Sequence, residues 1–160
     1  MLAEPSLKSE ILYVEPGQLL VCTEPCLLKT ILGSCVSVCL YDTKLRQGGM
    51  NHFMLPSSAA PDVTSTRYGD QAMRALVERL ERLGSERRQL NASVFGGARV
   101  LFDVTEFMHL GRRNVEFALD WLSNAGIQVL EQGVLGQAAR RLEFDIASGA
   151  CTERKLGAGA

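Results

Sequence analysis

Residues 29–56 read KTILGSCVSVCLYDTKLRQGGMNHFMLP, and this stretch carries both the fold and the chemistry expected of the chain. Cys35 follows Gly33 and Ser34 directly, and His52 stands 17 positions later (52 − 35). A free thiol, with a pKa near ~8.5, is mostly protonated at neutral pH, so an attacking cysteine needs a proton acceptor. Imidazole can take that proton and later return it to a departing amine. We therefore predict that Cys35 is a nucleophile and His52 its base.

The same stretch predicts two neighbouring strands. Residues 36–41 are rich in β-branched and aromatic side chains, as in a largely buried strand. Residues 42–44 form a polar break, and residues 50–55 continue as a strand until Pro56 stops it. Antiparallel neighbours of this kind would bring Cys35 and His52 within side-chain reach.

Elements on either side of this stretch indicate a mixed structure. Residues 11–14 and 18–22 flank a Pro-Gly turn and predict a hairpin. Apolar residues spaced by three and four, each set followed by a glycine, predict two helices over residues 69–83 and 112–125. No repeat or linker divides the chain, so we expect one domain over residues 1–160, with an ordered core at about 10–156 and a frayed tail at 157–160. Further strands are expected at residues 91–95, 127–130, 142–146 and 151–156.

Composition excludes several classes of protein. The 160 residues are enough for one domain, and a chain of this length buries roughly 70% of its unfolded surface. Seventeen basic and 18 acidic side chains give a net charge of −1, so nothing attracts nucleic acid or anionic lipid in general. Residues 1–10 lack the apolar segment of a signal peptide, and no apolar run reaches about 18 residues. We expect a cytoplasmic protein with no membrane insertion and no nucleic-acid partner.

The chain has five cysteines, an odd number without a secretion signal, which predicts reduced thiols. Cys22 and Cys26, and Cys35 and Cys39, form two C-x3-C pairs that would permit a zinc site. The second pair, however, lies in an apolar strand without a knuckle glycine, and free cysteine is among the most buried residue types. We therefore expect no metal, and we assign Cys22, Cys26, Cys39 and Cys151 to packing.

Three further roles can be assigned around the two reactive residues. The backbone N–H groups of the Gly33-Ser34-Cys35 turn can stabilise the negative charge that develops on a carbonyl oxygen under attack. A third group usually fixes the imidazole tautomer. Thr30 is our candidate for it, and the spacing of Asn51 or Asp42 fits equally well. Asn51 and Tyr68 are candidates to line the pocket.

Several motifs together resemble one family, the chemoreceptor glutamine deamidases called CheD. The resemblance covers about residues 10–156, and its motifs follow one another in the family's order. The matching segments are Leu32-Gly33-Ser34-Cys35-Val36, Cys39-Leu40-Tyr41-Asp42, Gly48-Gly49-Met50-Asn51-His52-Phe53-Met54-Leu55-Pro56, Arg67-Tyr68-Gly69-Asp70, Phe95-Gly96-Gly97-Ala98, Gly111-Arg112-Arg113-Asn114 and Arg140-Arg141.

The resemblance implies an α+β fold, with a mixed β-sheet or sandwich core and about two main outer helices, similar to the catalytic domain of cytotoxic necrotizing factor toxins. It implies an amidohydrolase that needs no cofactor. Family members convert particular glutamines of the cytoplasmic domain of methyl-accepting chemotaxis receptors into methylatable glutamates and ammonia. The family's nucleophile falls on Cys35, its base on His52 and its orienting threonine on Thr30. Some members bind the phosphatase CheC, which makes CheC a candidate partner of an otherwise monomeric enzyme.

The chain departs from the family pattern at two places. In some members the threonine stands one residue farther from the cysteine, where this chain has Lys29. Leu135-Gly136 replaces what is often a pair of glycines. An alternative function is a catalytically silent docking module of a chemotaxis signalling complex, although Cys35 and His52 are both present.

Overall fold

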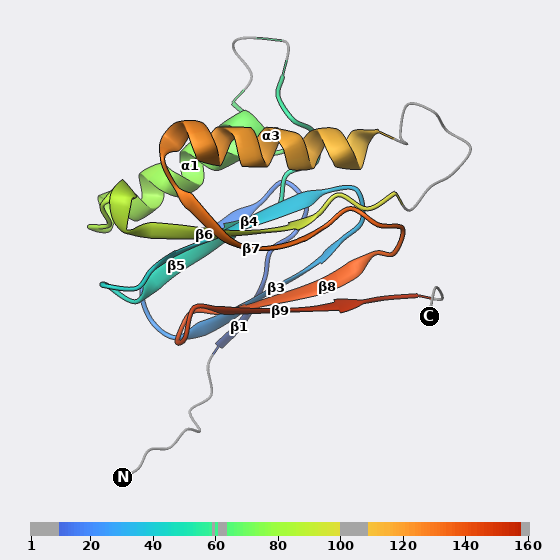
Figure 1. Cartoon of the computed structure of the whole chain (residues 1–160). Helices are drawn as coiled ribbons and strands as arrows, with labels where there is room; N and C mark the ends of the chain where they lie inside the picture. Colours follow the sequence, from blue (N-terminus) through green and yellow to red (C-terminus); the bar gives the residue numbers. More distant parts are fainter. Residues whose placement is uncertain (1–9, 59, 61–63, 100–108, 158–160) are drawn as a thin grey trace.

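The computed structural model describes residues 10–58, 60, 64–99 and 109–157, and in these residues it has three layers. Two α-helices cover one face of a five-stranded sheet, and a four-stranded sheet packs against the other face (Figure 1). The strands are β1 (Glu10–Tyr13), β2 (Leu19–Cys22), β3 (Cys26–Leu32), β4 (Val36–Asp42), β5 (Gln47–Asn51), β6 (Leu90–Gly96), β7 (Gln128–Val134), β8 (Arg140–Asp145) and β9 (Ala150–Lys155), and the helices are α1 (Gly69–Arg82), the 3-10 turn η1 (Arg87–Gln89) and α3 (Leu110–Ala125). The expected α+β class with two main outer helices is confirmed.

The five-stranded sheet has the order β2-β5-β4-β6-β7, with β4 at its centre. Every residue of β4 is buried, because both of its faces are covered. Successive side chains of a strand point to opposite faces. Val36 and Val38 accordingly pack with the helices, whereas Cys39 and Tyr41 pack against the four-stranded sheet. The prediction of a buried strand at residues 36–41 is thus confirmed.

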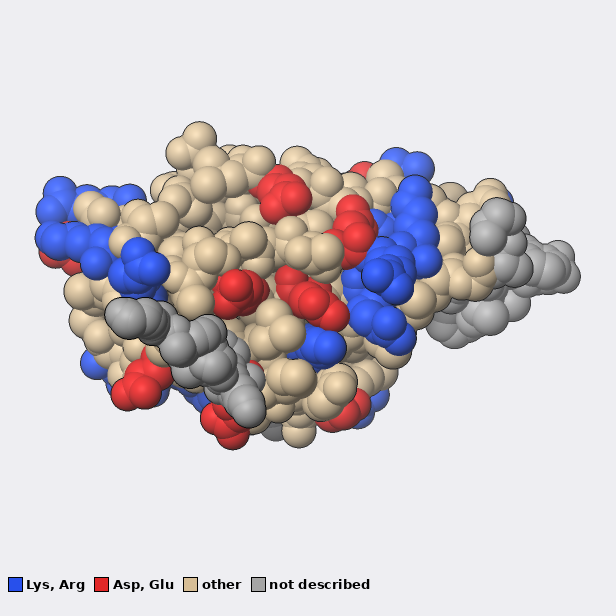
Figure 2. Space-filling view, turned by 90° about the horizontal axis from the view of Figure 1, so that it is seen from below, with Lys and Arg blue, Asp and Glu red and all other residues tan. Residues whose placement is uncertain are grey.

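The four-stranded sheet has the order β1-β3-β8-β9 and buries only its inner face. Leu28, Leu142 and Phe144 on that face belong to the core between the two sheets. On the outer face, Figure 2 shows acidic and basic side chains interspersed with uncharged ones, and basic side chains gather in a band toward one side.

The predicted hairpin of residues 11–14 and 18–22 is wrong, because β1 and β2 lie in different sheets. β1 runs parallel to β3 and β2 runs antiparallel to β5. The turn at Gly17 carries the chain between the two layers, and the Gly17 N–H donates to the carbonyl of His52 (2.8 Å). Apolar patterning predicted that both runs are strands, but it does not reveal the partner of each.

The other elements follow the sequence closely. β5 starts earlier than expected and ends before His52, after which Phe53 and Leu55 make only isolated bridges. Helix α3 starts two residues earlier than expected and ends at Gly126, whose φ of 74° suits a residue without a side chain. Leu135, at the replaced glycine pair, adopts a φ of 67°, so the loop keeps the left-handed geometry that a glycine would favour. The tail residues 158–160 lie outside the described residues.

The cysteine assignment needs one correction. Cys22 and Cys26 form a disulfide across the β2–β3 turn, with their Cα atoms 6.8 Å apart, so they are neither reduced nor merely packed. The spacing of four residues is short enough for the turn to bring the two thiols together. Cys39 and Cys151 pack in the core between the sheets, as expected. No helix in the described part of the chain is long and apolar enough to span a membrane.

Candidate active site

The pairing of β4 with the segment after β5 places Cys35 and His52 on one face. Val36 and Phe53 bond to each other through both backbone N–H groups (3.0 and 3.1 Å). Cys35 precedes Val36 and His52 precedes Phe53, so the two side chains point to the face opposite to that of Val36. They occupy diagonal positions on the antiparallel pair, where side chains can touch. That face lies against the four-stranded sheet.

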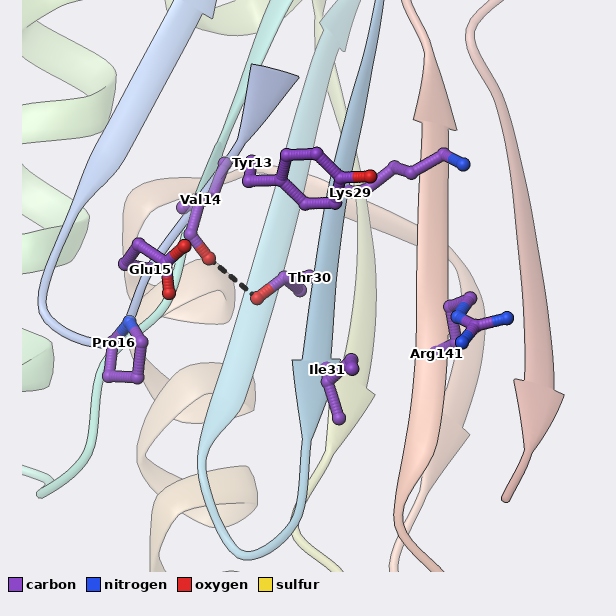
Figure 3. Close-up of a pocket in the computed structure, with 8 residues that line it drawn as sticks. All are labelled: Tyr13, Val14, Glu15, Pro16, Lys29, Thr30, Ile31 and Arg141. Atoms are coloured by element: carbon purple, nitrogen blue, oxygen red, sulfur yellow. Dashed lines mark hydrogen bonds between the residues drawn. The ribbon is translucent and has the colours of Figure 1, made fainter. Parts of the chain in front are cut away.

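Thr30 of β3 reaches His52 from the opposite sheet. Its hydroxyl lies 2.8 Å from Nδ1 of His52 and 2.7 Å from the carbonyl oxygen of Val14, and Figure 3 shows it directed at Val14. A carbonyl oxygen only accepts, so the single proton of Thr30 is donated to Val14. Thr30 must then accept from Nδ1–H of His52, which leaves Nε2 without a proton. The geometry thus favours the tautomer that can act as a base through Nε2.

Burial sets the charge of both candidate groups, Cys35 and His52. His52 is 2% exposed, and burial lowers its pKa to about 4, a shift that a hydrogen bond to the Val14 backbone partly opposes. Burial also raises the pKa of the half-buried Cys35 thiol. Both shifts disfavour the charged forms. The resting pair at neutral pH is therefore a thiol and a neutral imidazole, not a thiolate and an imidazolium.

The buried His52 should make the fold sensitive to acid. In the unfolded chain a histidine binds its proton near pH ~6.5, well above the folded value of about 4. The unfolded state therefore takes up the proton first, and stability falls as the pH falls from 6.5 towards 4. We expect the free energy of unfolding to drop by about 2–3 kcal/mol between pH 7.5 and 4.5 through this residue alone.

Urea denaturation at the two pH values measures this effect. On acidification, the His52→Gln variant should lose about 2–3 kcal/mol less stability than the wild type. The control is His109→Gln, at the other of the two histidines, and it should behave as the wild type does. Equal pH dependence in the wild type and His52→Gln would contradict the lowered pKa.

The Gly33-Ser34-Cys35 turn is held by its carbonyl groups. Ala98 N–H donates to the Gly33 carbonyl (2.9 Å) and Gly97 N–H to the Cys35 carbonyl (2.9 Å). The Ser34 carbonyl accepts from the side-chain amide of Asn114 (3.0 Å). Among the described residues, no group accepts a hydrogen bond from the N–H groups of the turn. Within the described part of the chain, the N–H groups of the turn are therefore left without a hydrogen-bond acceptor.

The side chains of the two alternative orienting residues point away from His52. Asn51 accepts from Val38 N–H (2.8 Å) and donates to Sδ of Met73 in α1 (3.2 Å), so its side chain faces the helices. Asp42, at the far end of β4 from Cys35, accepts from the backbone of the next turn. The pocket candidate Tyr68 directly precedes α1, and its backbone bridges Leu55.

A cavity of about 580 Å³ opens beside Thr30. It is lined by residues 13–16, residues 29–31 and Arg141, and Cys35 is not part of this lining. Figure 3 shows Thr30 and Ile31 on β3 with Arg141 on the neighbouring strand. The cavity therefore reaches the Thr30 side of the Thr30–His52 contact.

Two polar residues near the pair were not assigned a role from sequence. Ser37 lies opposite His52 in the extended register, and its buried hydroxyl has no hydrogen-bond partner among the described residues. Asn114 appeared only as a member of a motif, yet its amide bonds to the turn before Cys35. Strand alternation could have identified Ser37, which stands two residues after Cys35. Asn114 is 79 residues from Cys35 (114 − 35), and no local pattern connects them.

Comparison with known proteins agrees with the resemblance seen in the motifs. A family model described as CheD chemotactic sensory transduction matches residues 54–155. This range begins two residues after His52 and thus excludes the three candidate catalytic residues. The chain is also similar to the "Probable chemoreceptor glutamine deamidase CheD 1" of Anaeromyxobacter dehalogenans, with 44% identity over 144 residues that cover 90% of this chain and 84% of that protein.

A second relative and one solved structure are also similar to this chain. The "Probable chemoreceptor glutamine deamidase CheD" of Halorhodospira halophila is 39% identical over 149 residues, which cover 88% of this chain and 68% of that protein. Among solved structures, the hypothetical protein YfiH of Bacillus licheniformis aligns with a TM-score of 0.46 and 15% identity, over 81% of this chain and 61% of that one.

Proposed function

Because the chain belongs to the CheD family, we propose that it is a protein-glutamine deamidase that converts glutamines of chemoreceptors into glutamates. The observation that supports this most directly is the Thr30–His52 hydrogen bond of 2.8 Å, which prepares His52 as a base on the face that also carries Cys35. Cys35 is proposed as the nucleophile, His52 as the base and Thr30 as the orienting residue.

In the proposed acylation, Sγ of Cys35 attacks the side-chain amide carbon of a glutamine while Nε2 of His52 takes the thiol proton. The amide oxygen becomes an oxyanion, and the free N–H groups of the Gly33-Ser34-Cys35 turn stabilise it. His52 then gives its proton to the amide nitrogen, the C–N bond breaks, and ammonia leaves a thioester.

In the proposed deacylation, a water molecule attacks the thioester carbon and loses a proton to His52. The C–S bond breaks, the sulfur recovers the proton, and the product is a glutamate side chain. Each step uses only groups of the chain and water, so we propose that no cofactor takes part. The neutral resting pair means that proton transfer accompanies the attack on the amide, since no preformed thiolate is available.

We propose that one deamidase domain acts as a monomer in the cytoplasm on the cytoplasmic domain of methyl-accepting receptors, with CheC as a candidate regulator. A reducing cytoplasm would open the Cys22–Cys26 disulfide, which lies at the end of β3 remote from Cys35.

Mass spectrometry tests the proposed function. A purified receptor cytoplasmic fragment incubated with the protein should gain, at particular glutamines, the mass difference between an amide and a carboxylic acid. Ammonia should appear in equal amount. A receptor fragment that binds the protein but shows no mass gain would instead indicate a catalytically silent docking module.

The neutral resting state also predicts how Cys35 reacts with an alkylating agent. Because burial raises its pKa, labelling by iodoacetamide should accelerate steadily up to and above pH 9, without a plateau between pH ~6 and ~8. Peptide-resolved mass spectrometry separates Cys35 from Cys39 and Cys151. A plateau below pH ~7 would mean that a thiolate–imidazolium pair exists at rest.

A further inference from the structure

We propose that Asn114 is a positioning residue that holds Cys35 and His52 in register, an inference that rests on the proposed function. Its Nδ2 atom lies 3.0 Å from the carbonyl oxygen of Ser34 and 3.1 Å from that of Met54. Ser34 is the residue before Cys35, and Met54 is the second residue after His52. One side chain thus links the segments that carry the two reactive groups.

The chemistry of the contact requires an amide nitrogen. Both partners are carbonyl oxygens, which only accept hydrogen bonds, so the two hydrogens on Nδ2 serve one partner each. This fixes the orientation of the amide. Asn114 is fully buried, and its Oδ1 has no hydrogen-bond partner among the described residues. A buried oxygen without a partner costs free energy, so packing alone would favour an apolar residue at this position.

Close packing of glycines brings α3 near enough for this contact. Gly111, one turn before Asn114, approaches Gly97 so closely that a Cβ atom on Gly111 would collide with the Gly97 carbonyl group. Gly97 itself donates its N–H to the Cys35 carbonyl (2.9 Å). Two motifs that are far apart in the sequence therefore meet at the turn before the thiol, and Asn114 is the polar side chain that α3 contributes there.

A single isolated bridge, Val36–Phe53, and not a continuous strand holds the segment of His52 to Met54 beside β4. The Val36–Phe53 bridge fixes the backbone between Cys35 and His52, and the Asn114 amide fixes it at the end next to Cys35. If the amide is lost, the turn and the segment can move apart. The distance between thiol and imidazole then varies, and a displacement of 1 Å costs up to about 10²-fold in rate.

The test compares Asn114→Leu, which removes both hydrogen bonds and the unpartnered oxygen, with two controls on the same helix. Asn124→Leu alters an exposed asparagine. Leu122→Ala removes buried apolar contacts and lowers stability without touching the turn. With a receptor fragment as substrate, we expect Asn114→Leu to lower kcat about 10- to 100-fold with KM nearly unchanged, and both controls to retain kcat. The urea midpoints of Asn114→Leu and Leu122→Ala show whether the two variants have lost the same stability. If their midpoints coincide and their kcat values are also equal, the proposal is overturned.

A second readout needs no receptor and separates this proposal from the proposed function. Iodoacetamide should label Cys35 several-fold faster in Asn114→Leu than in the wild type, because a loosened turn exposes the thiol, and at the wild-type rate in Leu122→Ala. If the wild type deamidates nothing, the proposed function fails, and labelling alone decides the role of Asn114. In that case, equal labelling rates of Cys35 in the wild type and in Asn114→Leu overturn the positioning role of Asn114. Faster labelling in Asn114→Leu supports that role.

Discussion

The Cys35→Ser variant is expected to lose at least about 10⁴-fold of its deamidation rate on a receptor fragment. Serine keeps the size and position of the side chain but replaces the thiol by a hydroxyl, which is far less acidic and a weaker nucleophile. The pKa of His52 is lowered to about 4, so the imidazole is too weak a base to compensate. The Cys35→Ala variant should lose as much, since it has no nucleophile.

The measurement is the mass gain of the receptor fragment over time, at protein concentrations that would reveal a small residual rate. Cys151→Ser is the matched control, because Cys151 is a half-buried free cysteine on β9 and lies outside the proposed site. It should retain the wild-type rate. Substantial deamidation by Cys35→Ala would show that another group attacks the amide.

The placement of Cys35 and His52 on one face of the sheet could be predicted because it depends on local rules. Both residues belong to neighbouring segments of one antiparallel pair, and the period of two along a strand decides which side chains share a face. The same rule places Asn51 on the opposite face from His52, so alternation could have excluded it as the orienting group. Asp42, seven positions from Cys35 along a strand, is about 23 Å away by the rise per residue.

The part of the site that comes from other layers could not be derived from local patterns. Thr30 contacts His52 only because the two sheets pack face to face, and β3 does not pair with β5. The sequence spacing did not distinguish Thr30 from Asn51 or Asp42 as the orienting residue. The resemblance to the family selected Thr30. The hairpin was wrong for the same reason, since apolar patterning does not say to which sheet a strand belongs. Asn114 depends on the packing of α3, which sequence spacing does not reveal.

The Thr30→Val variant is expected to lower kcat about 10²- to 10³-fold with little change in KM. Valine has nearly the shape of threonine, so the change removes the hydroxyl and leaves the packing. Without that acceptor, the Nδ1 proton of His52 is no longer held, and the imidazole can adopt the tautomer with the proton on Nε2. That tautomer cannot accept the Cys35 proton. A complete change of tautomer costs about 10⁴-fold in a comparable triad. The loss here should be smaller because Thr30→Val leaves both tautomers possible and forces neither of them.

Thr30→Ser keeps the hydroxyl and should restore most of the rate, whereas Thr152→Val, at an exposed position of β9, should change nothing. Nitrogen NMR of His52 tests the cause directly: Nδ1 should carry the proton in the wild type and in Thr30→Ser, and the proton should shift toward Nε2 in Thr30→Val. If Thr30→Val has the wild-type tautomer but a low kcat, the hydroxyl acts in some way other than by orienting the imidazole. If it has the wild-type kcat, another group orients His52.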